Sequence, residues 1–243
     1  MRFFKLEFLL ICVLSGQLFV VNCFAEGVGS SAGGTLLQPV SAKAAGIAEA
    51  YTSVAGEIVG LPYNPAGIAA FKGRELSAMY QNGLADDNFG AVLFGASSEF
   101  GAWGMSVGYY DTGEIDMYDL DANLVSKTGQ KDIVAAVGAG LTVKNYEQFS
   151  YGASLKLISS EIFGEKATAA AFDAGLQYRD FMPNINIGVA VQNIGSDLKY
   201  ISKKEKLPAV VRVGSSYTLM AGENRFRASV DLPYMMNEKE TLS

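Results

Sequence analysis

From residue 74 onward, large apolar side chains alternate with small or polar ones along the chain. Residues 101–110 illustrate the pattern: Trp103, Met105, Val107 and Tyr109 fall on one face, opposite Ala102, Gly104, Ser106 and Gly108. A period of two is typical of a β-strand whose two faces have different surroundings. It predicts nine strands, at residues 74–82, 88–98, 101–111, 131–144, 148–159, 167–179, 184–193, 208–220 and 224–232.

The length of these segments indicates a membrane. Each holds about 9–14 residues, more than an ordinary soluble strand and close to a tilted membrane-spanning strand. The small, polar face also carries charges, among them Lys156, Asp173, Arg212 and Asp231. A charge facing lipid costs about 2–4 kcal/mol at mid-bilayer, so we expect these four side chains to face a lumen. The pattern predicts an all-β protein, an antiparallel transmembrane β-barrel over residues 74–232, with a soluble exported β-sandwich as the alternative.

The connections between the predicted strands alternate in length. The longer ones are 83–87, 112–130, 160–166 and 194–207, and the shorter ones are 99–100, 145–147, 180–183 and 221–223. Outer-membrane barrels have short periplasmic turns and longer external loops, so we expect the longer connections to lie outside the cell. Aromatic residues near the strand ends are candidates for the two interfacial girdles: Tyr80, Tyr109, Tyr110, Phe149, Tyr178 and Tyr217.

Nine strands are an odd number, whereas closed single-chain barrels of this class have an even number. The polar tail, residues 233–243, would then end on the outer side of the membrane. An unclosed sheet also leaves its edge groups unpaired in lipid. We therefore expect an incomplete strand set: a fragment, the product of a frameshift, or strands that need a partner.

The first 25 residues have the features of a secretory signal peptide. Arg2 and Lys5 precede a mostly apolar run at residues 8–21, and the small residues Cys23 and Ala25 suit cleavage after Ala25. We expect export to the outer membrane of a Gram-negative-type bacterium. An uncleaved anchor, or a lipoprotein modified at Cys23, is the alternative. Both cysteines, Cys12 and Cys23, lie in this leader.

Residues 26–73 lack the strand pattern. A stretch of small residues from Ser41 to about Val54 predicts a short helix with Ser41 as its N-cap. Turn-forming prolines follow, in the sequence Asn64-Pro65-Ala66-Gly67. Ahead of a barrel, such a segment forms either a hatch inside the lumen or a periplasmic tail.

Composition excludes much enzyme and nucleic-acid chemistry. The 243 residues contain no histidine, so a Ser-His-Asp triad and histidine-ligated metals are excluded. A net charge of −6 argues against nucleic acid. Glycine pairs such as Gly27 and Gly29 complete no phosphate loop. We expect no enzyme activity, no catalytic residues, no cofactor and no metal.

Two predicted external loops leave alternatives open. Asp119, Asp121 and Asn123 place oxygen ligands at alternate positions, which fits either a weak calcium loop or a solvated acidic loop. The next long loop contains a basic cluster, which either contacts anionic surface lipid or is simply solvated: Lys199, Lys203, Lys204 and Lys206.

Four short motifs, in this order along residues 33–232, resemble the PorV/PorQ family of outer-membrane proteins, a branch of the FadL-type long-chain fatty-acid transporter superfamily. They are Asn64-Pro65-Ala66-Gly67-Ile68-Ala69, Ala171-Phe172-Asp173-Ala174-Gly175-Leu176-Gln177-Tyr178, Val191-Gln192-Asn193-Ile194-Gly195 and Leu207-Pro208-Ala209-Val210-Val211-Arg212-Val213-Gly214. The resemblance implies a barrel of about 14 strands with an N-terminal hatch that contains Asn64, Pro65 and Ala66. This chain has about five strands fewer.

The resemblance implies two roles. A PorV-like barrel acts in protein secretion and binds secreted cargo or secretion-system proteins. A FadL-like barrel passes hydrophobic small molecules beside a hatch that rearranges. The expected partners are therefore outer-membrane lipid together with one of these two, and a soluble interaction or adhesion protein is the alternative outside the membrane.

Overall fold

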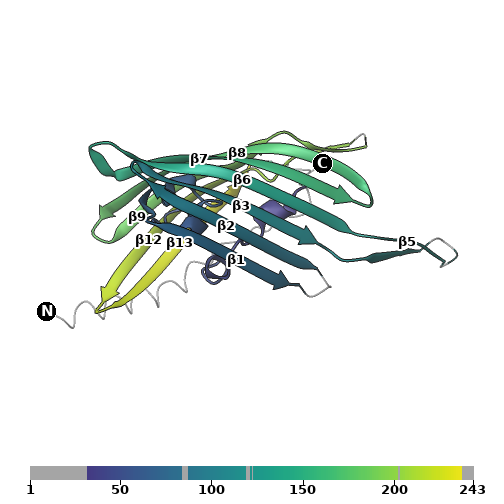
Figure 1. The fold of residues 1–243 in the computed structure, drawn as a ribbon, viewed down its shortest axis with the longest axis horizontal. Coiled ribbons are helices and arrows are strands. Elements are labelled where there is room, and N and C mark those ends of the chain that lie inside the picture. Colours follow the sequence, from purple (N-terminus) through teal and green to yellow (C-terminus); the bar gives the residue numbers. More distant parts are fainter. Residues whose placement is uncertain (1–31, 84–86, 119–120, 122, 202, 237–243) are drawn as a thin grey trace, which may run out of the picture.

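The computed structural model describes residues 32–83, 87–118, 121, 123–201 and 203–236. Nine strands form one antiparallel sheet that curls into a half-barrel (Figure 1). In spatial order the strands are β1 (Arg74–Asn82), β2 (Asn88–Ser98), β3 (Gly101–Asp111), β6 (Gln130–Val143), β7 (Tyr146–Ile162), β8 (Glu165–Met182), β9 (Ile185–Gly195), β12 (Val210–Ala221) and β13 (Asn224–Met235). The nine strands predicted from the alternation are confirmed, and the bounds of β1, β2 and β3 are as predicted.

One predicted connection is wrong. Residues 160–166 form no external loop, because β7 and β8 continue through them and only Phe163 and Gly164 separate the two strands. Both of these residues have positive φ, 53° and 80°, as in the two-residue turns that match the twist of a hairpin. The side-chain alternation also continues, since Ser160 is buried. The predicted alternation of long and short connections therefore fails here.

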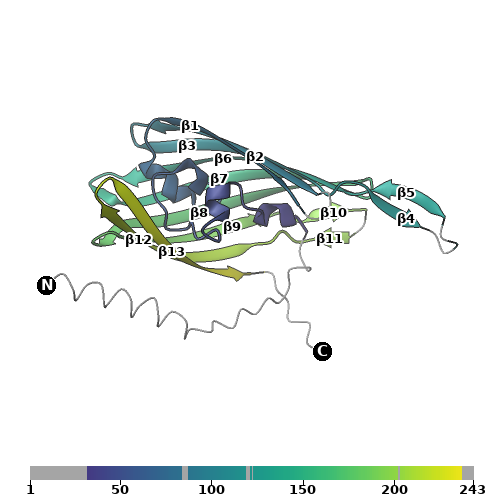
Figure 2. The same ribbon diagram turned by 90° about the horizontal axis from the view of Figure 1, so that it is seen from below.

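The two longest connections contain short hairpins that the alternation did not reveal. The connection after β3 holds β4 (Ile115–Tyr118) and β5 (Leu124–Thr128), and the connection after β9 holds β10 (Leu198–Tyr200) and β11 (Lys203–Glu205). Both hairpins lie at the same end of the large sheet, and β4–β5 projects well beyond it (Figures 1 and 2).

Strands β1 and β13 are the two edges of the large sheet. Because the nine strands are antiparallel neighbours, both edges run in the same direction. Strand β13 continues to Met235, so the predicted start of the tail at residue 233 is too early. Residues 237–243, like the predicted signal peptide, lie outside the described residues.

Residues 32–73, here called the N-terminal segment, lie in the hollow of the curled sheet (Figure 2). They form no strand and four short helices: η2 (Gly34–Leu37), α2 (Ala42–Ala45), η3 (Ile58–Gly60) and η4 (Pro65–Ala70). Ser41 caps α2 as predicted, and its hydroxyl accepts a 3.0 Å hydrogen bond from the Ala44 amide. The predicted helix to Val54 is too long, because Ala48 and Glu49 adopt left-handed backbone angles that end it.

The two faces of the sheet differ as the sequence predicts. The convex face exposes large apolar side chains on every strand, for example Val107 (52%), Val137 (53%), Leu155 (62%) and Val230 (60%). The concave face buries small and polar side chains beneath the N-terminal segment, including Ser154, Asp173 and Gln192. No helix within the described part of the chain is long and apolar enough to span a bilayer.

Candidate functional site

The contact between the N-terminal segment and the concave face rests on a line of glycines. This glycine row crosses seven strands and consists of Gly95, Gly104, Gly138, Gly140, Gly152, Gly175, Gly188 and Gly214. A Cβ at Gly152 would lie 2.5 Å from the Ala66 nitrogen, and one at Gly138 would lie 2.9 Å from the Leu61 side chain. Such spacing is too close for a carbon atom. The glycine row therefore lets the N-terminal segment pack directly on the backbone of the sheet.

The predicted hatch motif, Asn64, Pro65, Ala66 and Gly67, is the centre of this contact, and all four residues are buried. The Asn64 side-chain nitrogen donates to the backbone carbonyl of Thr52, at 2.7 Å, and to that of Leu176 on β8, at 3.1 Å. Its Oδ1 accepts from the Ala66 amide at 3.0 Å and so caps η4. A Cβ at Gly67 would lie 2.6 Å from the Val54 carbonyl oxygen. Asn64 therefore joins two parts of the segment to the sheet.

Lys156 and Asp173, two of the predicted lumen residues, form a buried ion pair. Their charged atoms lie 2.8 Å apart, and their side chains are 5% and 0% exposed. Asp173 also accepts hydrogen bonds from the Ser154 hydroxyl and the Asn193 backbone nitrogen, both at 2.8 Å. Lys156 donates to the Asn193 side-chain oxygen at 2.7 Å. Each buried charge is thus both paired and hydrogen-bonded.

The other two predicted lumen residues contact the N-terminal segment. Arg212 donates to Gln192 at 2.9 Å, and Gln192 in turn donates to the carbonyls of Pro62 and Tyr63 at 2.5 and 2.9 Å. Asp231 of β13 accepts from the Thr52 backbone nitrogen at 3.0 Å and from its hydroxyl at 2.6 Å. All four predicted residues lie on the concave face. That this face lines the lumen of a closed barrel stays a prediction.

Glu57 is a centre of charge that sequence reasoning missed. Its carboxylate accepts from Lys43 at 2.6 Å, from Arg227 of β13 at 2.8 Å and from the Tyr51 hydroxyl. Burial alone would raise the pKa of Glu57, but these hydrogen bonds together hold it below the ordinary value of 4.5. The sequence gives no signal for the Arg227 contact, because the two residues are 170 positions apart.

A second polar centre surrounds Asp132, which the alternation places on the polar face and which is fully buried on β6. It accepts hydrogen bonds from Thr35 of η2, from Ser160 of β7 and, at 2.7 Å, from Gln130. The Tyr200 hydroxyl of β10 donates to Ser160 at 2.6 Å. This network joins the N-terminal segment, the sheet and the β10–β11 hairpin at one end of the half-barrel.

The Glu57 contacts predict a pH-dependent attachment of the N-terminal segment. Because the folded-state pKa of Glu57 lies below its unfolded value, the charged form stabilises docking above about pH 4.5, and this contribution is lost as the pH falls further. We expect the protease resistance of the segment to decrease as the pH falls below about 4.5. Glu57→Gln should flatten this dependence. An equally steep loss in that variant would contradict the assignment.

A small cavity lies between the N-terminal segment and strands β2, β3, β6, β7, β9 and β12. Its volume is about 50 Å³. Leu36, Leu61 and Phe89 form part of its apolar wall, and Lys156 and Arg212 lie at its polar side. A volume of this size holds only a few water molecules. A larger molecule therefore fits this cavity only if its lining residues move.

No model of a known protein family matches this chain, and no curated protein matches it. The resemblance to the PorV/PorQ family therefore stays a prediction that depends on the four motifs. Within the described residues, no three carboxylate, histidine or cysteine side chains gather as ligands for a metal ion. Asp121 and Asn123 of the suggested calcium loop are described, but Asp119 lies outside the described residues.

Proposed function

We propose that the large sheet forms part of the wall, and the N-terminal segment the plug, of an outer-membrane β-barrel. We propose a PorV/PorQ-like role in protein secretion for this barrel and no enzyme activity. One observation carries the proposal. The nine strands expose large apolar side chains on one face, while three charged side chains within the strands, Asp132, Lys156 and Asp173, are buried on the other face. Exposure of such an apolar surface to water is unfavourable, whereas contact with the hydrocarbon core of a bilayer is favourable.

Protein binding fits the structure better than passage of small molecules. The cavity between the N-terminal segment and the sheet has a volume of only about 50 Å³. The β4–β5 hairpin projects from one end of the sheet and exposes Tyr118 and Leu124 to a protein partner. A FadL-like passage of hydrophobic molecules is the second candidate, favoured by the apolar wall of the cavity. Loss of secreted proteins in a deletion strain, with unchanged fatty-acid uptake, distinguishes the two.

The soluble β-sandwich alternative requires a second sheet over the apolar face, and the described strands form a single large sheet. Val137→Arg tests it, because Val137 lies at the middle of β6 and is 53% exposed. We expect this variant to lose membrane insertion, since arginine costs about 2–4 kcal/mol at mid-bilayer.

Tyr146→Arg is the matched control for Val137→Arg. Tyr146 is 69% exposed at the end of β7, where the cost falls to about 0–1 kcal/mol. Heat-modifiable gel mobility and fractionation with outer membranes measure insertion. If both variants behave like the wild type, or if the wild type is recovered folded without detergent, the membrane proposal is wrong.

A further inference from the structure

The convex face carries a groove at the end where the hairpins lie. Its volume is about 480 Å³, within the range of ligand-binding clefts. Small side chains on three neighbouring strands form its floor, including Ala135 of β6, Ser159 of β7 and Ala170 of β8. Ile133 and Leu157, which are 48% and 66% exposed, form apolar walls. An apolar depression of this kind can hold a hydrocarbon chain.

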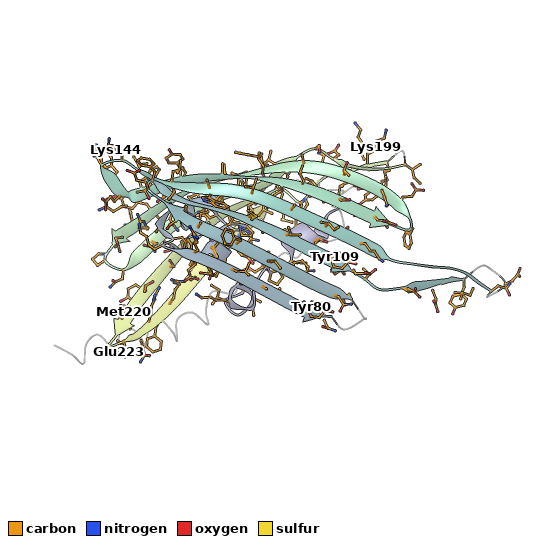
Figure 3. The ribbon with its side chains drawn as sticks, in the orientation of Figure 1. Tyr80, Tyr109, Lys144, Lys199, Met220 and Glu223 are labelled. Atoms are coloured by element: carbon orange, nitrogen blue, oxygen red, sulfur yellow. The ribbon has the colours of Figure 1, made fainter. Side chains whose placement is uncertain are left out.

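The groove ends at Ser196, just before the basic β10–β11 hairpin. The Ser196 hydroxyl accepts a hydrogen bond from the Ala170 backbone nitrogen at 3.1 Å, and the Ser196 backbone nitrogen donates to the Ala170 carbonyl at 3.0 Å. These two hydrogen bonds fix Ser196 at the groove. Lys199 follows three residues later, so the two Cα atoms lie within about 10 Å of each other. In Figure 3, Lys199 lies at the same end as Tyr80 and Tyr109 and points away from the strands.

The lysines of this hairpin concentrate positive charge, which favours binding of an anion. Lys199 and Lys204 are direct partners across the two strands, an arrangement in which like charges repel. Lys203 pairs with Glu205 at 2.6 Å, but Lys199, Lys204 and Lys206 have no ion-pair partner among the described residues. This concentration of lysines stands against a net charge of −6 for the chain. A bound anion would relieve the repulsion.

The hairpin presents these lysines on a fixed support. Leu198 is fully buried among Ala167, Ala169 and Ala171 of β8. Tyr200 donates to Ser160 at 2.6 Å, and the Lys206 carbonyl accepts from the Ala32 nitrogen at 3.2 Å. Lys199 and Lys204 therefore belong to an ordered surface element and not to a solvated loop without contacts.

We propose that this groove and hairpin form a binding site for a membrane lipid with a phosphate headgroup. The acyl chain occupies the groove, and the phosphate contacts Lys199 and Lys204. The inference rests on the proposed function, which places the apolar convex face in the bilayer. The groove distinguishes a lipid from free phosphate, because it offers a hydrocarbon chain a site within reach of the same lysines.

The test compares two lipids with the same fluorescent acyl chain and different headgroups, phosphatidylglycerol and phosphatidylcholine, added to the full chain in detergent micelles. We expect wild-type protein to prefer phosphatidylglycerol and Lys199→Gln/Lys204→Gln to lose on the order of tenfold in affinity for that lipid alone. Ala170→Trp should fill the groove and weaken both lipids. High salt should reduce the headgroup preference.

Lys72→Gln/Lys144→Gln is the matched control, because it removes two exposed lysines at the opposite end of the sheet, where Lys72 precedes β1 and Lys144 follows β6. This control should bind like the wild type, and circular dichroism confirms that each variant folds. Equal affinity of the wild type for the two lipids, or an Ala170→Trp variant that binds both normally, would overturn the lipid site.

Insertion of the same preparation into phosphatidylcholine vesicles separates this inference from the proposed function. A chain that inserts but shows no headgroup preference overturns the lipid site and leaves the membrane barrel standing. A chain that inserts into no vesicle overturns the proposed function, and the lipid site with it.

Discussion

Gly152→Val is expected to release the N-terminal segment from the sheet. Any Cβ at this position meets the backbone of Pro65 and Ala66, and backbone atoms cannot rotate away as a flexible side chain does. Valine adds two further carbons at the same place. We expect the free energy of unfolding to fall by about 3 kcal/mol or more, which is the upper end of the usual cost of overpacking a protein core.

Limited proteolysis measures the release, since an undocked segment exposes cleavage sites between residues 32 and 73. Gly34→Val is the matched control, because a Cβ at Gly34 meets no atom within 4 Å and this glycine does not have a positive φ. The Gly34→Val variant should be cleaved by the protease, and should unfold, like the wild type. Full protease resistance of Gly152→Val would show that the glycine row is not what holds the segment.

The strands of the large sheet could be predicted because their signal is local. Alternation along Trp103, Met105 and Val107 identifies both the strand and its exposed face without reference to any other part of the chain. The connections between the strands are harder to predict from the sequence. Polar residues such as Ser160 and Glu161 suit either a loop or the end of a strand, and the turn at Phe163 and Gly164 settles the choice only in the folded chain.

The N-terminal segment was predicted less well, because its structure depends on the sheet. The small residues after Ser41 favour a helix locally, yet the chain turns at Ala48 and buries Tyr51 and Thr52 completely. Thr52 then bonds Asp231, which is 179 residues away. A contact of such separation leaves no pattern in the sequence, so tertiary packing overrides the local helix preference.

The long-range contacts give the N-terminal segment a structural task. Among the described strands, β13 has one neighbour, β12, and its inward side chains Arg227 and Asp231 are held by Glu57 and Thr52 of the segment. The segment therefore supports an edge strand that would otherwise depend on one ladder alone. Sequence reasoning placed Asp231 on the inner face but could not identify its partner.

Breaking the Lys156–Asp173 pair from one side is expected to destabilise the protein by about 3–5 kcal/mol, because it leaves one charge buried without a counter-ion. Lys156→Met leaves the Asp173 carboxylate, and Asp173→Asn leaves the Lys156 ammonium. Combining the two substitutions removes both charges. The double variant should therefore be more stable than the sum of the single losses predicts.

Urea unfolding of the refolded protein in detergent, followed by circular dichroism, gives the four free energies of this cycle. The exposed pair Lys166–Glu161 offers a matched control on the same two strands, at 3.5 Å with side chains 74% and 39% exposed. Lys166→Met or Glu161→Gln should cost about 0–1 kcal/mol, as for other solvated ion pairs. If the buried single variants cost no more than these controls, water reaches Lys156 and Asp173, and the concave face is not sealed by the N-terminal segment.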